Sequence, residues 1–530
     1  MQARIFFRRQ ARSGRPETMV PGVLALLALV ALAGFERPAI AAVGNPAQGQ
    51  FEGERQYQGK DGQEHDIEEP TKKVRSVARG ALKAGKANSN EEQAAVEQLF
   101  QYDVRSLTWS ENVAKLADLR AVLKKQLIDL GKAPLGDLHD ELNQLALSTC
   151  HDAATDDRYP MAVRFNCLLM IGELDAKEGS GVPKVVVPLP EANKVLLDVV
   201  ADAKQPEVLR LAAMLGLRRH VLEGLPAEAQ NVVAESLMTI IGKPLDPEND
   251  SIVTLWLRLR AIETMHQLAK KGLKTDQQSV AAALSQMIAD AQIPNRIRCE
   301  AAGELSGIEV GYFAPKKVVH DVQALANLVI AMSAANPFTK IAHQAALERE
   351  AAERAEAAKG RRKRADDKKE EAKDDETEDD EPALPLTKPM RDVAVHAMLY
   401  DLGRVRLGLM GREPAKRGEP PNSSTHGLFA AADAETQKTI TVLVTHVDAM
   451  LTELAKLNEK KDVLKEDVAK VALSIEDSGR ALAEALDEQA AAAKESESAP
   501  EPEKAVAEPA VRRGKPSGNA PARESTVGSP

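Results

Sequence analysis

Apolar residues recur with a helical period through the middle of the chain, each time around an arginine. Beside Arg164, the offsets −1, +3, +4 and +7 are occupied by Val163, Cys167, Leu168 and Ile171. These offsets fall on one face of a helix. The same offsets carry apolar residues around three further arginines, which are Arg210, Arg258 and Arg298. The pattern therefore predicts a set of related helices.

Helix-opening residues and a second amphipathic segment accompany these copies. In three of the four, a proline lies four residues before the arginine, where it can open a helix; these are Pro160, Pro206 and Pro294. The arginines are 46, 48 and 40 residues apart, and the intervals hold further amphipathic segments at 191–203, 227–241 and 277–291. A helix pair every 40 to 47 residues or so is typical of an α-solenoid.

Two copies carry a family resemblance. Residues 157–164 (DRYPMAVR) and 293–302 (IPNRIRCEAA) resemble the Pro-x-x-Val-Arg-x-x-Ala-Ala core of the second helix of a HEAT repeat. The resemblance covers about 134–336 and one later piece. It implies an all-α fold in which 106–336, with the later piece, forms a right-handed α-solenoid of about five helix pairs. It also implies that the repeated arginines pair with acids or carbonyls of adjacent units rather than with a ligand.

A further copy follows a charged insertion. Arg391 has apolar residues at the same offsets, so 388–412 is expected to complete the last repeat. The insertion spans 337–387, and residues 361–381 within it hold seven basic and eleven acidic side chains. Such a segment cannot bury a core, and we expect it to be disordered or partly helical. It is either a linker or part of a binding face, where insertions in solenoids often lie.

The pattern changes again over 435–486, where apolar residues alternate in steps of three and four. A seam sustained over six heptads predicts a long amphipathic or coiled-coil helix. Two interpretations stay open: self-association through 436–486, or a helix bent near 458–461 and docked on the end of the repeats. The tail, 487–530, is rich in Ala, Glu, Pro and Ser and is expected to be disordered.

The N-terminal 42 residues have the three parts of a secretory signal peptide. Five arginines precede the first acid, an apolar run covers 20–35, and Ala39-Ile40-Ala41 supplies an exit site. As a helix the run reaches about 24 Å, short of the ~30 Å hydrocarbon core. We expect 1–42 to be removed near Ala41 or Ala42 and the protein to be exported, to the periplasm or outside the cell. A membrane anchor at 20–35 is the alternative.

Between the signal and the repeats, 43–105 is expected to be a polar and basic spacer, largely disordered. It contains a run of six cations without an acid, namely Lys72, Lys73, Arg75, Arg79, Lys83 and Lys86. Such a run indicates a solvated helix face, or contact with an anionic membrane or polymer.

Composition narrows the class of protein. The chain has 530 residues, of which 28% are charged and only 3% aromatic, and its net charge is −10. The shortage of aromatic residues argues against a large β-sandwich or barrel, and the negative charge against a global nucleic-acid footprint. Cys150, Cys167 and Cys299 are widely spaced; buried thiols are expected, with a Cys150–Cys167 disulfide as the alternative.

No catalytic motif stands out. The sequence has no His-Glu-x-x-His, Gly-x-Ser-x-Gly or paired-cysteine zinc motif, and the loop at 80–87 lacks the Ser or Thr that a phosphate loop needs. Cys150, His151 and Asp152 are adjacent, so on a helix they point about 100° apart. His220, His266 and His396 have no spaced partner. We expect no catalytic residue, cofactor or metal ion.

These observations favour an exported, non-enzymatic helical-repeat scaffold that binds other proteins in the cell envelope. Two alternatives remain: a structural coiled-coil oligomer of the envelope, and an enzyme or accessory subunit whose site on the solenoid leaves no mark in the sequence. Protein partners, with a homo-oligomer through 436–486 as an option, are expected rather than nucleic acid.

Overall fold

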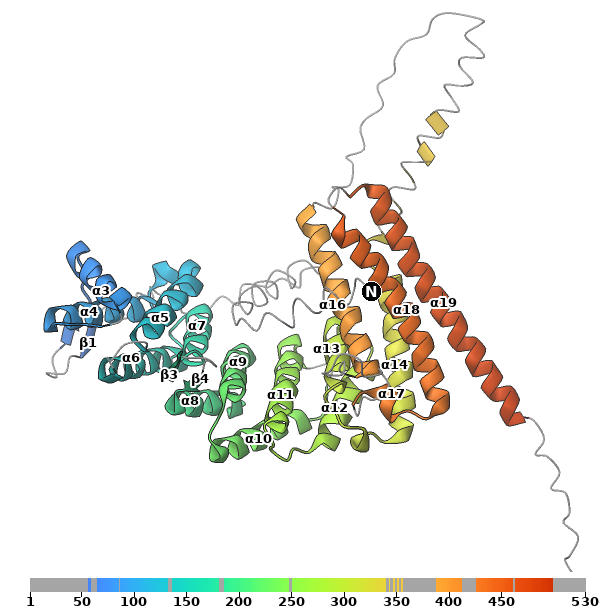
Figure 1. Ribbon diagram of the computed structural model, residues 1–530, viewed down its shortest axis with the longest axis horizontal. Coiled ribbons are helices and arrows are strands. Elements are labelled where there is room, and N and C mark those ends of the chain that lie inside the picture. The colour runs from blue at the N-terminus through green and yellow to red at the C-terminus, as the bar shows by residue number, and fades with distance from the viewer. Residues whose placement is uncertain are drawn as a thin grey trace, which may run out of the picture. The chain divides into compact units, whose positions relative to one another are not determined.

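The computed structural model describes residues 56–58, 64–84, 86–131, 136–180, 185–246, 250–339, 388–411, 426–460 and 463–498, with a few single residues between 343 and 355. Most of these are helical, and the strands among them form two short antiparallel hairpins (Figure 1). The expected all-α class is confirmed. The chain divides into two units, 1–483 and 484–530, and the second begins within the final helix.

The described chain begins with a small helical group. Strand β1 (Gln56–Gln58) pairs with β2 (Glu64–Asp66), and helices α3 (Lys72–Ala84) and α4 (Asn90–Ser106) follow. The two helices pack on each other and bury Ala78, Leu82, Leu99 and Phe100. The segment expected to be a disordered spacer, 43–105, thus contains two packed helices. The buried face of α3 is hard to recognise in the sequence, because the helix is rich in cations and its buried alanines are small.

Two rows of helices make up most of the remaining fold. The first row holds α4, α6 (Gly136–Thr155), α8 (Pro190–Ala201), α10 (Ala227–Gly242), α12 (Gln277–Ala289) and α14 (Pro315–Ala334). The second row holds α5 (Leu116–Gly131), α7 (Met161–Ile171), α9 (Glu207–Glu223), α11 (Ile252–Lys270), α13 (Asn295–Leu305) and α16 (Lys388–Met410). Each second-row helix packs on its successor in the row and on the first-row helix that precedes it in the chain.

The core of the two rows follows the predicted apolar face. All residues at the offsets −1, +3, +4 and +7 around Arg164, Arg210, Arg258 and Arg298 are 1% exposed or less. Pro160, Pro206 and Pro294 occupy the N-cap positions of α7, α9 and α13. Helix α11 begins instead after Ser251, whose hydroxyl accepts a hydrogen bond from the amide of Thr254. The helix-opening role of the prolines is therefore confirmed.

A β-hairpin between α7 and α8 interrupts the helices. Strands β3 (Asp175–Ser180) and β4 (Val185–Pro188) pair antiparallel, with register shifts along β3. β3 has the sequence DAKEGS, which lacks the β-branched and aromatic residues of a typical strand. Asp175 and Glu178 of this strand are buried, so its conformation depends on charged partners from other helices. Two short 3-10 helices, η2 (Ser110–Lys115) and η3 (Val310–Tyr312), connect other elements.

The segment 435–486 forms two helices rather than one. After the short α17 (Leu428–Ala431), α18 (Ala434–Glu459) and α19 (Lys465–Ser498) are separated by the residues around 460–464. The break interrupts the apolar seam, and Leu464 is 63% exposed there. The seam residues of α18, such as Leu443, Val447 and Leu454, are buried, and α18 packs on α16 and α14. The seam of α18 is therefore occupied within the chain.

Several expectations fall outside the described residues. These are the signal peptide or anchor at 1–42, most of the insertion at 337–387, and the tail from 499 onward. The part of the expected tail that is described, 487–498, continues α19 as helix. Among the helices that the structure describes, none combines the length and apolarity needed to cross a membrane.

Candidate interaction face

The repeated arginines clamp the end of the helix that precedes them. In three copies, Nε donates a hydrogen bond of 2.9–3.0 Å to the backbone carbonyl ten residues earlier; the pairs are Arg164 to Ala154, Arg210 to Val200 and Arg298 to Ile288. These carbonyls lie in the last turn of a first-row helix, where no helical amide remains to bond them. The clamp joins the two helices of one pair, whereas the sequence suggested a bond between adjacent pairs.

The remaining copies vary this arrangement. Arg258 reaches the carbonyl of Ile241, at the end of α10, through Nη2 instead of Nε. Arg164 also contacts Gln205 of the next pair at 3.4 Å. Arg391 departs from the arrangement, since its guanidinium donates to the carboxylate of its neighbour Asp392, at 2.7 Å from Nη2. Burial lowers the pKa of Arg164, Arg210, Arg258 and Arg298, and their hydrogen bonds to carbonyls compensate part of that cost.

A second set of polar contacts runs from helix to helix along the second row, and we call it the charge ladder. It begins at Asp175, which is 1% exposed and lies just after α7. Lys124 of α5 donates to its carboxylate at 2.7 Å, and to Glu178 at 2.8 Å. Arg219 of α9 reaches the same carboxylate at 2.7 Å and the carbonyl of Gly172 at 3.0 Å. One buried acid of β3 thus links α5 and α9.

The ladder continues through α11 and α13. Arg218 of α9 lies 3.2 Å from the carboxylate of Glu263 on α11, which also pairs with Arg260. The next link joins His266 Nδ1 of α11 to Glu304 Oε2 of α13 at 2.8 Å. Both links join neighbouring second-row helices. The arginine clamps, by contrast, join the two helices of one pair.

The last links bind α16 into the row. Arg404 donates to Glu304 at 2.6 Å and lies 3.1 Å from Glu300, while Arg296 pairs with Asp401. Arg406, also on α16, donates a hydrogen bond to Asp448 of α18 at 2.6 Å. Partners about 100 residues apart therefore fix α16 beside α13.

Burial and ion pairing shift several pKa values in this part of the ladder. Burial opposes the ionisation of Glu304, but the hydrogen bond from His266 and the charge of Arg404 outweigh it and lower its pKa to about 2. Burial raises the pKa of Asp401 to about 6 although Arg296 counteracts it. Burial, with the nearby Glu300 carboxylate, raises the pKa of Tyr400 to about 12. At neutral pH the ladder holds mainly paired, opposite charges.

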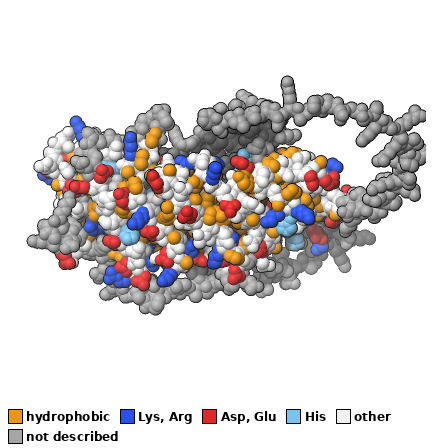
Figure 2. Space-filling model, turned by 90° about the horizontal axis from the view of Figure 1, so that it is seen from below, with side chains coloured by type: hydrophobic (Ala, Val, Ile, Leu, Met, Phe, Trp, Pro, Cys, Tyr) orange, Lys and Arg blue, Asp and Glu red, His pale blue; other side chains and the backbone are white. Residues whose placement is uncertain are grey.

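Aromatic side chains stack on the arginines of the ladder. The guanidinium of Arg296 lies 4.1 Å from the centre of the Tyr400 ring, and that of Arg260 lies 5.1 Å from the Trp256 ring. Tyr400 remains 45% exposed, whereas Trp256 is buried. Seen from below in Figure 2, acidic and basic side chains of the described surface are interspersed. On α13 and α16, the ladder therefore offers an exposed tyrosine held in place by a cation.

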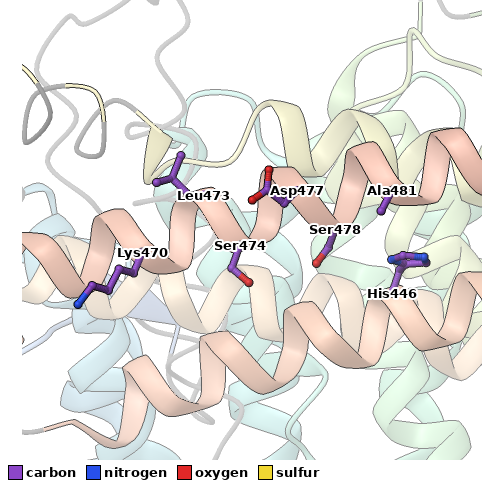
Figure 3. A pocket seen from close by; sticks show the side chains of 7 residues that line it. All are labelled: His446, Lys470, Leu473, Ser474, Asp477, Ser478 and Ala481. Atoms are coloured by element: carbon purple, nitrogen blue, oxygen red, sulfur yellow. The ribbon is translucent and has the colours of Figure 1, made fainter.

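An open groove lies between α18 and α19 (Figure 3). Its lining includes His446 of α18 and, on α19, Lys470, Ser474, Asp477 and Ser478. Figure 3 shows Leu473 and Asp477 pointing away from the side on which Ser474 and Ser478 lie. Burial lowers the pKa of His446. The polar groups do not converge on one point, so the groove has no evident reactive centre.

The other residues singled out in the sequence are placed as follows. Cys150, Cys167 and Cys299 are buried and form no disulfide. His220 is fully buried in α9, and His396 is exposed on α16, with Nδ1 2.6 Å from the carbonyl oxygen of Asp392. In the described part of the chain, no three His, Cys, Asp or Glu residues gather as they would around a metal ion.

Sequence reasoning missed the charge ladder. Its members stand at different offsets from the repeated arginine, for example +2 for Glu300, +5 for Glu263 and +9 for Arg219. No periodic signal could have grouped them, because their partners come from other helices.

Comparison with protein-family models, with curated proteins and with solved structures gives no match for this chain.

Proposed function

We propose that this protein is an exported, non-enzymatic α-solenoid of the HEAT type that binds another protein through its second row of helices. The observation that carries the proposal is the repeated unit: a helix pair closed by an arginine clamp, followed by a ladder link to the next pair. Repeat arrays of this kind present side chains from successive units on one extended surface. We take the stack to be right-handed, as HEAT arrays are.

The proposed contact surface is centred on Tyr400, with Arg296 and Arg260 on the neighbouring helices. Tyrosine, tryptophan and arginine are the residues that most often dominate the energy of protein interfaces. Arg296 stacks on the Tyr400 ring, and Asp401 pairs with Arg296. This support reduces the rotamer freedom that would be lost on binding, which favours affinity.

The alternative of a coiled-coil oligomer receives less support. That function needs the seam over 436–486 to face a second chain, while Leu443, Val447 and Leu454 are buried against helices of the same chain. Export rests on the N-terminal 42 residues alone and is tested by sequencing the N-terminus of the protein recovered from culture.

The binding proposal is tested by crosslinking pull-down from envelope fractions with wild-type protein, Tyr400→Ala and Tyr312→Ala. Tyr312 is the matched control, since it is 41% exposed on η3 and takes no part in the ladder. We expect a defined partner whose recovery falls about tenfold or more with Tyr400→Ala, because hot-spot residues contribute ~2 kcal/mol or more. Recovery with Tyr312→Ala should stay at the wild-type level.

Thermal unfolding followed by circular dichroism verifies that both variants are folded. If no partner is captured, or if both tyrosine variants lose it equally, the second row is not the binding surface. Enzymatic activity that requires ladder residues would contradict the non-enzymatic part of the proposal.

A further inference from the structure

Helix α3 carries a stripe of cations along one flank of the face that packs on α4, where the guanidinium of Arg75 lies 5.4 Å from the centre of the Tyr102 ring of α4. Lys72, Arg75, Arg79 and Lys83 are spaced by three, four and four residues, which places them on one helix face about 16 Å long. We call these four residues the basic stripe. The helix contains no acidic residue, and Lys72, Arg79 and Lys83 are exposed.

The face of α3 beside the stripe is occupied by the protein. Ala78, Ala81 and Leu82 are buried, and α3 packs on α4 and α5. The stripe therefore cannot turn inward without unpacking the helix. A Cβ placed on Gly80 would have no atom within 4 Å, so the outer surface of the helix is open there.

Few acids neutralise the stripe. Arg75 pairs with Glu69 at 2.7 Å, and Asp103 of α4 interacts electrostatically with Arg75 and Arg79. Lys73, which lies outside the stripe, pairs with Glu91. Among the described residues, no carboxylate forms an ion pair with Lys72, Arg79 or Lys83. Three cations thus face solvent in a chain whose net charge is −10.

We propose that the basic stripe of α3 docks on an anionic lipid surface. A row of cations on a convex helix matches a planar layer of phosphate headgroups, and each Lys or Arg close to such a surface adds roughly 1 kcal/mol. Helix α3 itself has no aromatic side chain, and the ring that lies at the stripe, Tyr102 of α4, is stacked on Arg75, so the stripe offers no row of rings of the kind on which single-stranded nucleic acids stack. Lipid is therefore the anionic partner that the chemistry favours.

The position of α3 in the chain supports the same partner. Only 36 residues separate the apolar run at 20–35 from Lys72. Even fully extended, they span at most about 130 Å. While the run lies in a membrane, whether as an anchor or during export, the stripe is held near the bilayer surface at raised local concentration.

The test measures binding of the full chain to vesicles by co-sedimentation. One set is pure phosphatidylcholine, and the other contains 30% phosphatidylglycerol. The stripe variant combines Lys72→Gln, Arg79→Gln and Lys83→Gln. The control combines Lys194→Gln, Lys204→Gln and Lys274→Gln, which are exposed lysines elsewhere, so that both variants lose three positive charges. Circular dichroism checks that both are folded.

We expect wild type and control to bind the anionic vesicles equally and the stripe variant to bind about 150-fold more weakly, roughly a factor of five for each cation. Binding of the wild type should also fall as salt screens the charges. Binding to phosphatidylcholine through the apolar run should be the same for all three proteins.

Equal binding of wild type and stripe variant to anionic vesicles would overturn the proposal. So would an equal loss in the control, because net charge rather than the stripe would then be responsible. A parallel assay measures binding of the same three proteins to soluble polyphosphate. If only this ligand distinguishes the stripe variant from wild type, the partner is a dissolved polyanion and the lipid proposal is wrong. None of these outcomes depends on whether Tyr400 binds a protein.

Discussion

At the scale of single residues, the arginine clamp explains why one residue type recurs at a buried position. Arg298 is 5% exposed, and its Nε donates to the carbonyl of Ile288 at 2.9 Å. A side chain of similar length that has no hydrogen-bond donor, such as methionine, would leave that carbonyl without this partner at the end of α12. The guanidinium satisfies it while its aliphatic stem fills space among apolar neighbours.

Replacing Arg298 by alanine should therefore destabilise the fold. We expect Arg298→Ala to lower the free energy of unfolding by about 2 kcal/mol, the usual cost of losing a hydrogen bond to a charged group in a buried setting. Arg391→Ala is the control, because the hydrogen bonds of Arg391 to described residues go to its neighbour Asp392, and the change should cost less than about 1 kcal/mol. Urea denaturation measures both. Equal losses would mean that the clamp contributes nothing beyond the packing of an arginine stem.

His220 makes stability depend on pH. The side chain is fully buried in α9, and burial together with Arg219 lowers its pKa to about 4. The unfolded chain, with a pKa near 6.5, binds a proton more readily, so this contribution is complete above pH 6.5 and is lost as the pH falls towards 4. Between pH 7.5 and 5 we expect a loss of about 2 kcal/mol, which His220→Leu should abolish. Denaturation of both proteins at the two pH values tests this; an unchanged slope in the variant would contradict it.

At the scale of elements, glycines set how closely the second-row helices approach. A Cβ on Gly408 of α16 would lie 2.1 Å from the carbonyl oxygen of Ala302 on α13. A Cβ on Gly216 of α9 would lie 2.8 Å from the Cα of Gly172, at the end of α7. Without a Cβ at these glycines, the helix backbones can approach closely. The side chains of the charge ladder on neighbouring helices are then near enough to form their ion pairs.

Gly408→Ala should force α16 away from α13. We expect a loss of about 1–3 kcal/mol, as for other overpacked sites, and earlier proteolysis within α16. Gly80→Ala in α3 is the matched control: it has open space around it and should gain about 0.5–1 kcal/mol from helix propensity. If Gly408→Ala is as stable as wild type in thermal unfolding, the close contact does not limit the packing of α16.

At the scale of the whole molecule, the apolar seam of α18 decides between self-association and intramolecular packing. Val447 is fully buried, and α18 packs on α16 and α14. Val447→Asp should therefore unfold the C-terminal helices and reduce the circular dichroism signal, while light scattering gives a monomer before and after the change. Thr445→Asp, two residues away on the exposed side, should leave the signal unchanged. A wild-type oligomer that dissociates with Val447→Asp would restore the coiled-coil interpretation.

The sequence by itself determined the helices, their apolar faces and the position of the repeated arginine. These depend on local contacts: a residue and its neighbours three and four positions away share one face, so a periodic pattern is enough. The core around Arg164 and its counterparts was predicted residue by residue for this reason. The sequence predicted α3 and β3 least well, because two of the three buried residues of α3 are alanines and the buried acids of β3 are paired charges.

Only the tertiary structure decided which groups meet. The carbonyl that each arginine clamps, the ladder from Asp175 to Asp448, and the exposed Tyr400 stacked on Arg296 depend on chain segments up to about 100 residues apart. An ion pair of this kind has no period and no fixed spacing, because its energy depends on distance and burial in the folded chain. The break between α18 and α19 lies close to the bend near 458–461 that the sequence offered as one of two interpretations. The tertiary structure decided that the seam of α18 packs on α16 and α14 of the same chain.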